Sequence, residues 1–95
     1  MFKELDPVMH SEVRLRIISL LVSMEEADFK YLLEQTKATA GNLSIQIEKL
    51  QSVGYIEVNK IFRNKRPCTL YRITQKGLEA FQKYVESLKS FLNNH

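Results

Sequence analysis

The sequence predicts a mainly α-helical domain with one β-hairpin, in the order helix, helix, helix, strand, strand and long C-terminal helix. Two observations support this fold class. Hydrophobic residues recur at helical spacings of three and four up to about Ser52 and again from Gln75, whereas between these regions they alternate with a period of two. A chain of 95 residues can bury one core and is too short for two, so residues 1–95 are expected to form a single domain.

The first helix is expected to end near Met24, and two residues compete to begin it. Asp6 followed by Pro7 is a plausible N-cap with proline at the first helical position, and Ser11 is a later alternative. The apolar residues of this helix fall on two stripes. One stripe can pack on the core of the domain, and the other, which contains Leu15, is open to a partner chain.

A second helix is expected over residues 29–36, with Asp28 as its N-cap. After a tight turn at residues 37–38, Thr39 is expected to cap a third helix that runs to about residue 52. Gly54 ends it, because glycine readily adopts the left-handed conformation just past a helix. Two short helices joined by a turn of this length are typical of a helix-turn-helix.

Alternating apolar residues then predict two strands, over residues 55–59 and 70–74, with turn residues 64–67 between them. The hairpin of residues 55–74 is called the wing. Between residues 58 and 78 the chain has six basic residues and no acidic one, although the net charge of the whole chain is only +3. The wing is therefore expected to attract a polyanion, although a basic surface segment is often only a solvated one.

The last helix is expected over residues 75–93 and would be about 28 Å long. Its apolar residues form a seam at spacings of three and four. A domain of this size cannot easily cover so long a seam, so we expect the distal part to contact a second copy of the chain. The alternative is that the helix folds back on its own core.

The order of elements is that of a winged helix-turn-helix, in which the third helix would meet the major groove of DNA. Leu43, Ile47 and Leu50 share one face of that helix and are expected to anchor it to the core. Ile45 lies roughly 180° from that face, among polar residues. Its side chain can pack on a thymine methyl group and so contribute to base recognition in the major groove. The alternative is that it is an ordinary exposed apolar residue.

Several stretches resemble those of a known family. GNLSIQIEKLQSVGYIEV, the basic turn RNKRP and the strand TLYRITQKGLEAF are similar to the small winged-helix transcriptional regulators related to the MarR and ArsR groups, and LDPVMHSEVRLRIISLL is similar to their first helix. The resemblance covers about residues 5–90. It implies a homodimer that binds double-stranded DNA through the third helix and the wing, and dimerises through the first and last helices.

These arguments give three sets of candidate residues. Those expected to contact DNA from the third helix and the turn before it are Lys37, Thr39, Asn42, Ser44, Ile45, Gln46 and Lys49. Those expected to contact DNA from the wing are Arg63, Asn64, Lys65 and Arg66. Those expected at the dimer contact are Leu5, Val8, Leu15, Phe81, Tyr84, Val85, Leu88, Phe91 and Leu92.

Other classes of function find little support in the sequence. A metal site needs three or four ligands, and the chain offers Cys68, His10 and His95, so neither a metal nor another cofactor is expected. No pair of a nucleophile and a base suggests an enzyme. No apolar run is long enough to span a membrane, and the start of the chain shows no secretion signal, so the cytoplasm is the expected location. A protein-interaction module and a non-specific architectural DNA binder remain as alternatives. The sequence shows no clear effector pocket and does not identify the operator.

Overall fold

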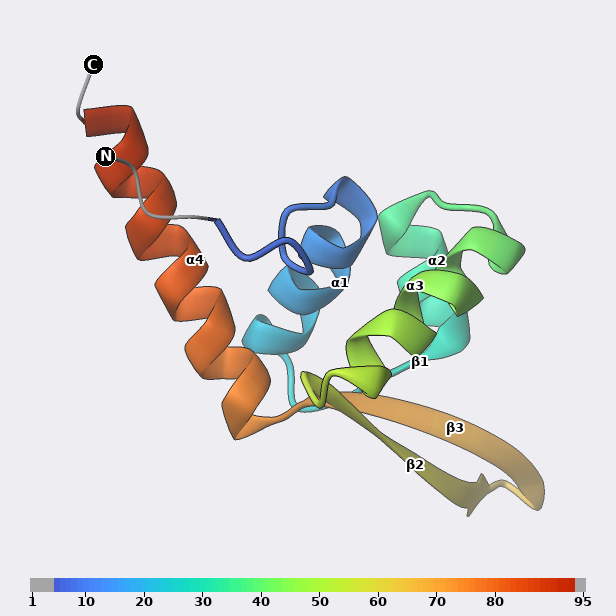
Figure 1. Ribbon diagram of the computed structural model, residues 1–95. Coiled ribbons are helices and arrows are strands. Elements are labelled where there is room, and N and C mark those ends of the chain that lie inside the picture. Colours follow the sequence, from blue (N-terminus) through green and yellow to red (C-terminus); the bar gives the residue numbers. More distant parts are fainter. Residues whose placement is uncertain (1–4, 94–95) are drawn as a thin grey trace.

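The computed structural model describes residues 5–93, and Figure 1 shows its seven elements. The predicted order of helices and hairpin strands is confirmed, with one short strand added. Residues 1–4 and 94–95 of the expected domain, including the potential ligand His95, lie outside the described residues. The elements are α1 (Glu12–Ser23), β1 (Ala27–Asp28), α2 (Phe29–Thr36), α3 (Ala40–Ser52), β2 (Ile56–Arg63), β3 (Arg66–Ile73) and α4 (Gln75–Asn93).

The strands form one antiparallel sheet in the order β1-β3-β2. β2 and β3 pair along their whole length, beginning with Ile56 opposite Ile73. The predicted strands over residues 55–59 and 70–74 are correctly placed but stop too early on the side of the turn. The alternation of apolar and polar residues fades there, whereas the backbone hydrogen bonds of the ladder do not depend on side-chain polarity.

The short strand β1 was not predicted. It pairs Ala27 with Tyr71 and Asp28 with Leu70 of β3, so it forms the edge of the sheet opposite β2. The sequence predicts a break between helices at Ala27 and the N-cap of the second helix at Asp28, and the cap is confirmed. A strand of two residues is too short to show a period of two, so the pairing depends on contacts distant in the sequence.

A two-residue turn, Asn64–Lys65, joins β2 to β3. Both residues have positive φ, 54° and 64°, which is the type I′ geometry that matches the twist of paired strands. The predicted turn over residues 64–67 is therefore wrong for Arg66 and Pro67, which belong to β3. Pro67 fits in the strand because it faces Phe62 at a non-hydrogen-bonded position, where its nitrogen points away from β2.

Ser11 caps α1, and its Oγ accepts a hydrogen bond from the backbone N–H of Arg14 at 3.5 Å. Of the two predicted starts, Ser11 is confirmed and the start at Asp6–Pro7 is wrong. Asp6 forms a separate turn, in which its Oδ1 accepts from the N–H of Val8 at 2.9 Å and its carbonyl accepts from the N–H of His10 at 2.8 Å. These are the bonds of a single helical turn, and the series breaks at Ser11, whose N–H donates to the carbonyl of Met9 at 2.8 Å, so the continuous helix begins only at Glu12.

The segment before α1 is held by hydrogen bonds to several other parts of the chain. Tyr55 donates its phenolic O–H to Oδ2 of Asp6 at 2.6 Å, and Nδ1 of His10 lies 3.0 Å from the hydroxyl of Tyr84 on α4. Arg14 donates to two carbonyl groups of the same segment, at 2.7 and 3.3 Å. The segment therefore links α4 to α1 and to the chain that follows α3.

The core is shared by all four helices and all three strands. α1 lies between α4 on one side and α2 and α3 on the other (Figure 1). The buried apolar side chains of the core are Met9, Ile17, Ile18, Leu21, Ala27, Leu32, Leu43, Ile47, Leu50, Ile56, Leu70 and Tyr84.

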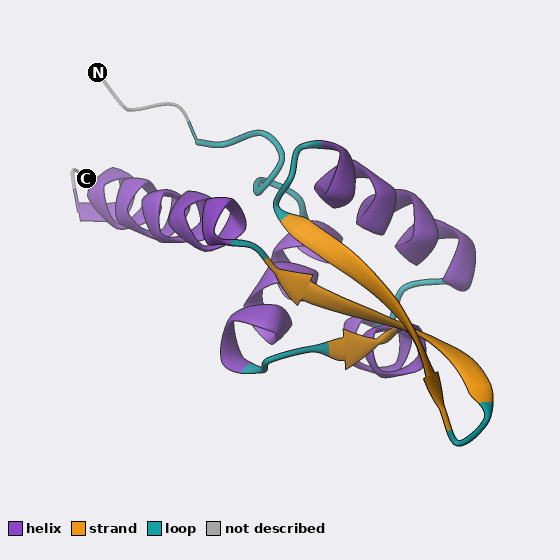
Figure 2. Cartoon of the chain, turned by 90° about the horizontal axis from the view of Figure 1, so that it is seen from below, coloured by secondary structure: helices purple, strands orange, loops and turns teal. Residues whose placement is uncertain are grey.

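The molecule is elongated, with extents of 54 × 26 × 21 Å. The wing projects at one end and α4 at the other, and Figure 2 shows the turn of the wing extending past the helices. The two regions that were expected to contact DNA and a second chain therefore lie at different ends of the domain.

Candidate nucleic-acid interface

α3 presents one buried face and one exposed face. Leu43 and Leu50 are fully buried, and Ile47 is 5% exposed, so the predicted anchors hold the helix against the core. Ile45 lies on the opposite side and is 55% exposed. A large aliphatic side chain in that position is available for contact with another molecule.

The turn before α3 presents two of the candidate residues to solvent. Lys37 ends α2 in the left-handed conformation, with φ of 61°, and its N–H donates to the carbonyl of Leu33 at 3.2 Å. Thr39 caps α3 as predicted, since its Oγ1 accepts from the N–H of Asn42 at 3.2 Å. Both side chains are exposed beside the positive end of the α3 dipole, where an anion is favoured.

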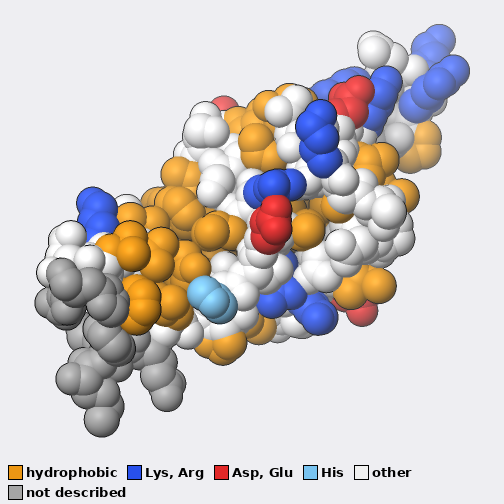
Figure 3. All heavy atoms as spheres, turned by 90° about the horizontal axis from the view of Figure 1, so that it is seen from above, with side chains coloured by type: hydrophobic (Ala, Val, Ile, Leu, Met, Phe, Trp, Pro, Cys, Tyr) orange, Lys and Arg blue, Asp and Glu red, His pale blue; other side chains and the backbone are white. Residues whose placement is uncertain are grey.

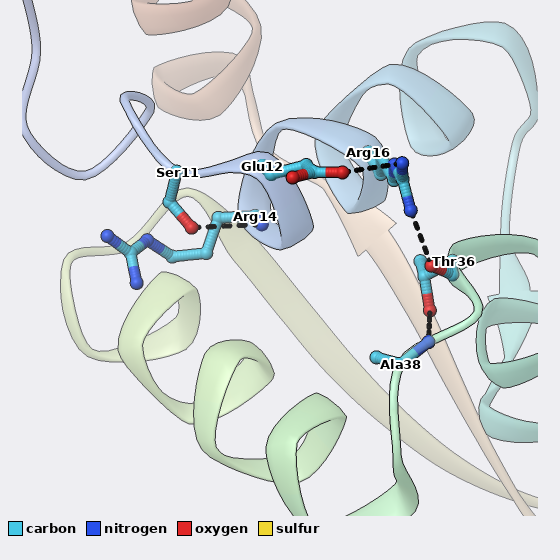
Figure 4. Close-up of polar contacts among 6 residues, drawn as sticks. All are labelled: Ser11, Glu12, Arg14, Arg16, Thr36 and Ala38. Atoms are coloured by element: carbon cyan, nitrogen blue, oxygen red, sulfur yellow. Dashed lines mark hydrogen bonds and ion pairs between the residues drawn. The ribbon is translucent and has the colours of Figure 1, made fainter.

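Arg16 of α1 fixes the position of this turn (Figure 4). Its Nη1 donates to the carbonyl of Thr36 at 2.9 Å, and its Nη2 pairs with Glu12 at 2.6 Å. The hydroxyl of Thr36, buried in the turn, donates to the carbonyl of Leu32 at 2.7 Å and accepts from the N–H of Ala38 at 3.5 Å. The start of α3 is therefore held from α1, through contacts that no sequence pattern indicated.

Two candidate residues on α3 are joined to each other and to α1. Arg14 donates through Nη1 to Oε1 of Gln46, and Gln46 donates through Nε2 to Oδ1 of Asn42 at 2.9 Å. Of the other candidates, Ser44 and Lys49 are also exposed on this helix, as Ile45 is. Sequence reasoning missed Arg14, because it precedes Gln46 by 32 positions and lies on a different helix.

The wing gathers positive charge at its tip. Figure 3 shows Lys and Arg side chains concentrated at that end of the molecule and hydrophobic side chains toward the other end. Arg72 is paired with Glu25 at 3.3 Å, so its charge is partly balanced within the chain. The four wing candidates are all exposed: Arg63, Asn64, Lys65 and Arg66.

Phe62 is a wing residue that sequence reasoning missed. It is 79% exposed, directly before Arg63 at the tip of the hairpin. The predicted strand ended at residue 59, which left the exposure of Phe62 unpredicted; its place directly before Arg63 in the sequence is the signal that could have identified it. An exposed aromatic ring next to cations suits contact with the sugars or base edges of a nucleic acid.

A hollow of about 390 Å³ separates α3 from the sheet. Its lining includes Glu48 and Gln51 of α3, Lys60 of β2 and Tyr71 of β3. Burial raises the pKa of the Tyr71 phenol, so the ring stays neutral at ordinary pH. Because Glu48 lines this hollow, it lies on the side of α3 that faces the sheet. Its carboxylate would be repelled by phosphate.

A second hollow, of about 770 Å³, lies between α4 and the segment before α1. Charged residues such as Asp6, Lys76 and Lys83 form much of its lining, together with Tyr55. Burial, and next the hydrogen bond and charge of Asp6, raise the pKa of Tyr55 to about 12. The phenol therefore remains a hydrogen-bond donor to Asp6 throughout the neutral range.

The candidate dimer residues do not all lie on an exposed face. Tyr84 is 5% exposed and belongs to the core of the chain itself, where it contacts His10. Leu92, near the end of α4, is 61% exposed. The remaining candidates are partly buried: Leu5, Val8, Leu15, Phe81, Val85, Leu88 and Phe91.

Residues 5–93 contain neither a metal-ligand cluster nor a membrane-spanning helix. No group of three or more His, Cys, Asp or Glu side chains there could hold a metal ion. No helix in the same range is long and apolar enough to cross a bilayer. Cys68 is a free, partly buried thiol on β3.

Comparison with known proteins gives consistent results. Residues 13–92 match a family model described as a winged helix DNA-binding domain. An uncharacterised protein of Methanocaldococcus jannaschii is 34% identical over 87 residues, which cover 92% of this chain and 95% of that protein.

Solved structures support the same fold. A transcriptional regulator homologue of Pyrococcus horikoshii OT3 superposes with a TM-score of 0.85 at 29% identity, covering 92% of this chain and 86% of that one. A MarR-family transcriptional regulator from Silicibacter pomeroyi matches in fold, with a TM-score of 0.69 at 14% identity over 87% of this chain and 55% of that one.

Proposed function

This chain belongs to the winged helix DNA-binding domain family, and we propose that it acts as a homodimeric transcriptional regulator of specific double-stranded DNA sites. In this proposal α3 enters the major groove and the wing contacts the minor groove or the flanking backbone. The place of action is the cytoplasm, where its DNA target would be found.

The single observation that carries the proposal is the composition of the exposed face of α3. Ile45 is 55% exposed between polar side chains, and the packing of α3 on the core does not explain a large aliphatic side chain at that position. An aliphatic group and amides on one face are what direct readout of base edges requires. Ser44 and Lys49 on the same helix can bind phosphate oxygens.

The wing supports the proposal independently. Arg63, Lys65 and Arg66 are exposed at the tip of a hairpin that projects beyond the helices. Narrow A·T-rich minor grooves concentrate negative potential and attract such side chains. Phe62 adds an apolar contact beside them, which a purely electrostatic backbone clamp would not need.

Dimerisation is proposed from the shape of α4. The helix is 19 residues long, and its last apolar residue, Leu92, is 61% exposed at the end away from the wing. A contact between two copies there would leave both wings and both α3 helices free. Two copies related by a two-fold axis would read a pseudo-palindrome with half-sites about 10 bp apart.

Selection from a random duplex library tests the proposal. The purified protein is mixed with the library, the bound DNA is sequenced, and the affinity for the pool is measured from low to moderate salt. We expect a two-fold symmetric motif and an affinity that falls steeply with salt.

Two results would contradict the proposal in different ways. Salt-sensitive binding without any motif would indicate a non-specific architectural binder. No binding at low salt would favour a protein-interaction module, since a winged helix can serve that purpose as well.

A further inference from the structure

Two amide side chains of α3, those of Asn42 and Gln46, belong to one chain of hydrogen bonds that starts on α1. Arg14 donates through Nη1 to Oε1 of Gln46, and Gln46 donates through Nε2 to Oδ1 of Asn42 at 2.9 Å. Nε and Nη2 of Arg14 donate to the carbonyls of Val8 and Pro7, at 2.7 and 3.3 Å. The guanidinium is thus held by the protein on three sides.

The direction of this chain follows from donor and acceptor chemistry. An arginine side chain has five donors and no acceptor, so the atom of Gln46 that faces Arg14 must be its oxygen. The amide nitrogen of Gln46 then faces Asn42 and must meet the oxygen of Asn42. Exchanging oxygen and nitrogen in either amide would place two donors or two acceptors against each other.

Asn42 is therefore left with its amide nitrogen for an external partner. Its Oδ1 is turned along the helix toward Gln46, and within residues 5–93 its Nδ2 donates to no protein group. The paired contact of an asparagine with adenine needs the amide oxygen and the amide nitrogen at the base together. In this arrangement one lone pair of the oxygen is used by Gln46 and the oxygen is turned along the helix, so the groups that Asn42 presents outward are its N–H donors.

We infer that Arg14, acting through Gln46, holds Asn42 as a hydrogen-bond donor, so that the site favours guanine over cytosine at the position that Asn42 reads. Guanine presents two acceptors in the major groove, N7 and O6, whereas cytosine presents the N4 donor there. The inference rests on the proposed function and makes it more specific. Arg14 is in this sense a positioning residue, because it acts through Gln46 and does not touch the base.

Gln46→Glu provides a test with a predicted reversal. A carboxylate at residue 46 can still accept from Arg14, but it can only accept from Asn42. Asn42 must then turn its nitrogen toward residue 46 and present its oxygen outward. The expected preference at this position changes from guanine to cytosine.

The position itself is found with Asn42→Ala, which should flatten the base preference at one place in each half-site. Wild-type protein should bind the guanine site at least about fivefold more tightly than the cytosine site, and Gln46→Glu should invert this ratio. Gln51→Glu is the matched control, since it adds the same negative charge on an exposed part of the same helix. It should lower affinity for both sites and leave their ratio unchanged.

Arg14→Met is a second variant that keeps most of the side-chain volume and removes the donors. Asn42 is then free to turn either way, so the guanine to cytosine ratio should fall toward one while the rest of the motif is retained. A merely structural role of Arg14 would lower affinity for all sequences alike. Thermal unfolding of each variant confirms that it is folded.

The failures of the two proposals can be told apart. A wild-type motif with adenine or cytosine at the position of Asn42 would overturn the inference and leave the proposed function intact. An unchanged guanine preference in Gln46→Glu, or no position flattened by Asn42→Ala, would do the same. A wild-type protein that selects no motif at all would overturn the proposed function and this inference with it.

Discussion

Gly77 lies so close to the carbonyl group of Tyr55 that no β-carbon fits between them. The same carbonyl oxygen accepts the N–H of Thr74 at 3.0 Å, so the start of α4 is held directly on the chain that leaves α3. We expect Gly77→Ala to lower the free energy of unfolding by about 1–3 kcal/mol, because the added methyl group must push two backbone segments apart. Urea unfolding at constant protein concentration measures the change.

Gly41→Ala is the matched control for this substitution. A β-carbon at Gly41 would meet nothing within 4 Å, and the residue lies in the first turns of α3. Alanine is the better helix former, so this variant should be more stable than wild type by about 0.5–1 kcal/mol. Equal stability of Gly77→Ala and wild type would mean that α4 can shift away from Tyr55 without cost.

The hydrogen bond from Tyr55 to Asp6 should make stability depend on alkaline pH. The pKa of Tyr55 is raised to about 12 in the folded chain, from an ordinary value of 10.0. A raised pKa favours the neutral phenol, so its stabilising contribution is complete below pH 10 and is lost as the pH rises toward 12. Ionisation removes the donated proton and places two negative charges side by side.

Tyr55→Phe tests this by removing the hydroxyl and keeping the ring. Wild type should be more stable than Tyr55→Phe up to about pH 10, and the difference should shrink between about pH 10 and 12. Denaturant unfolding of both proteins across that range is the measurement. A difference that stays constant up to pH 12 would show that the pKa of Tyr55 is the same in the folded and the unfolded chain, so that the contact with Asp6 does not raise it.

The sequence predicted those features that depend on local periodicity. The faces of α3 are an example, because spacing alone places Ile45 opposite the three anchors. The contact of Arg14 with Gln46 was not predictable, since it joins positions 32 residues apart on two different helices. The exposure of Phe62 was missed for a different reason: backbone pairing extends the hairpin into a segment where the apolar alternation fades.

A variant at the end of α4 tests the proposed dimer. Leu92 is 61% exposed in the single chain, so Leu92→Lys should cost the folded monomer little. At a dimer contact it would bury a charge against an apolar surface, and we expect the variant to be monomeric at concentrations where wild type is dimeric. Sedimentation equilibrium measures both. Ser90→Lys adds the same charge on the opposite side of the helix and should leave the dimer unchanged.

The wing should contribute a measurable part of the salt dependence of DNA binding. If Lys37, Lys49, Arg63, Lys65 and Arg66 each neutralise one phosphate, a dimer covers about ten. The plot of log K against log salt should then have a slope of about −9. In the double variant Arg63→Ala and Arg66→Ala, four phosphate contacts are lost per dimer. The slope should become about −5, with affinity reduced for all sequences alike.

A double variant on α4 controls for the loss of charge. Lys83→Ala and Lys89→Ala remove the same number of cations from exposed positions at the other end of the domain. They should change the long-range attraction slightly and leave the slope close to that of wild type. If both double variants lower the slope equally, the wing has no special place in the interface.

A substitution of Ile45 tests the proposed recognition of bases by α3. Its side chain is 55% exposed on the face of α3 that points away from the core, so Ile45→Ala should leave the fold intact. In the groove its methyl groups would pack on the methyl group of thymine, and removing them should reduce the preference for thymine at one position by about 1 kcal/mol or more. Library selection with both proteins gives the two preference matrices.

Val22→Ala shows what loss of an exposed aliphatic side chain does elsewhere. Val22 is 40% exposed on α1, outside the proposed interface, so this variant should select the wild-type motif at every position. Ile45→Val, which shortens the side chain by one methyl group, should fall between Ile45→Ala and wild type. If Ile45→Ala selects the same matrix as wild type, Ile45 is an ordinary exposed apolar residue, and specificity must come from the amides of α3 and from the wing.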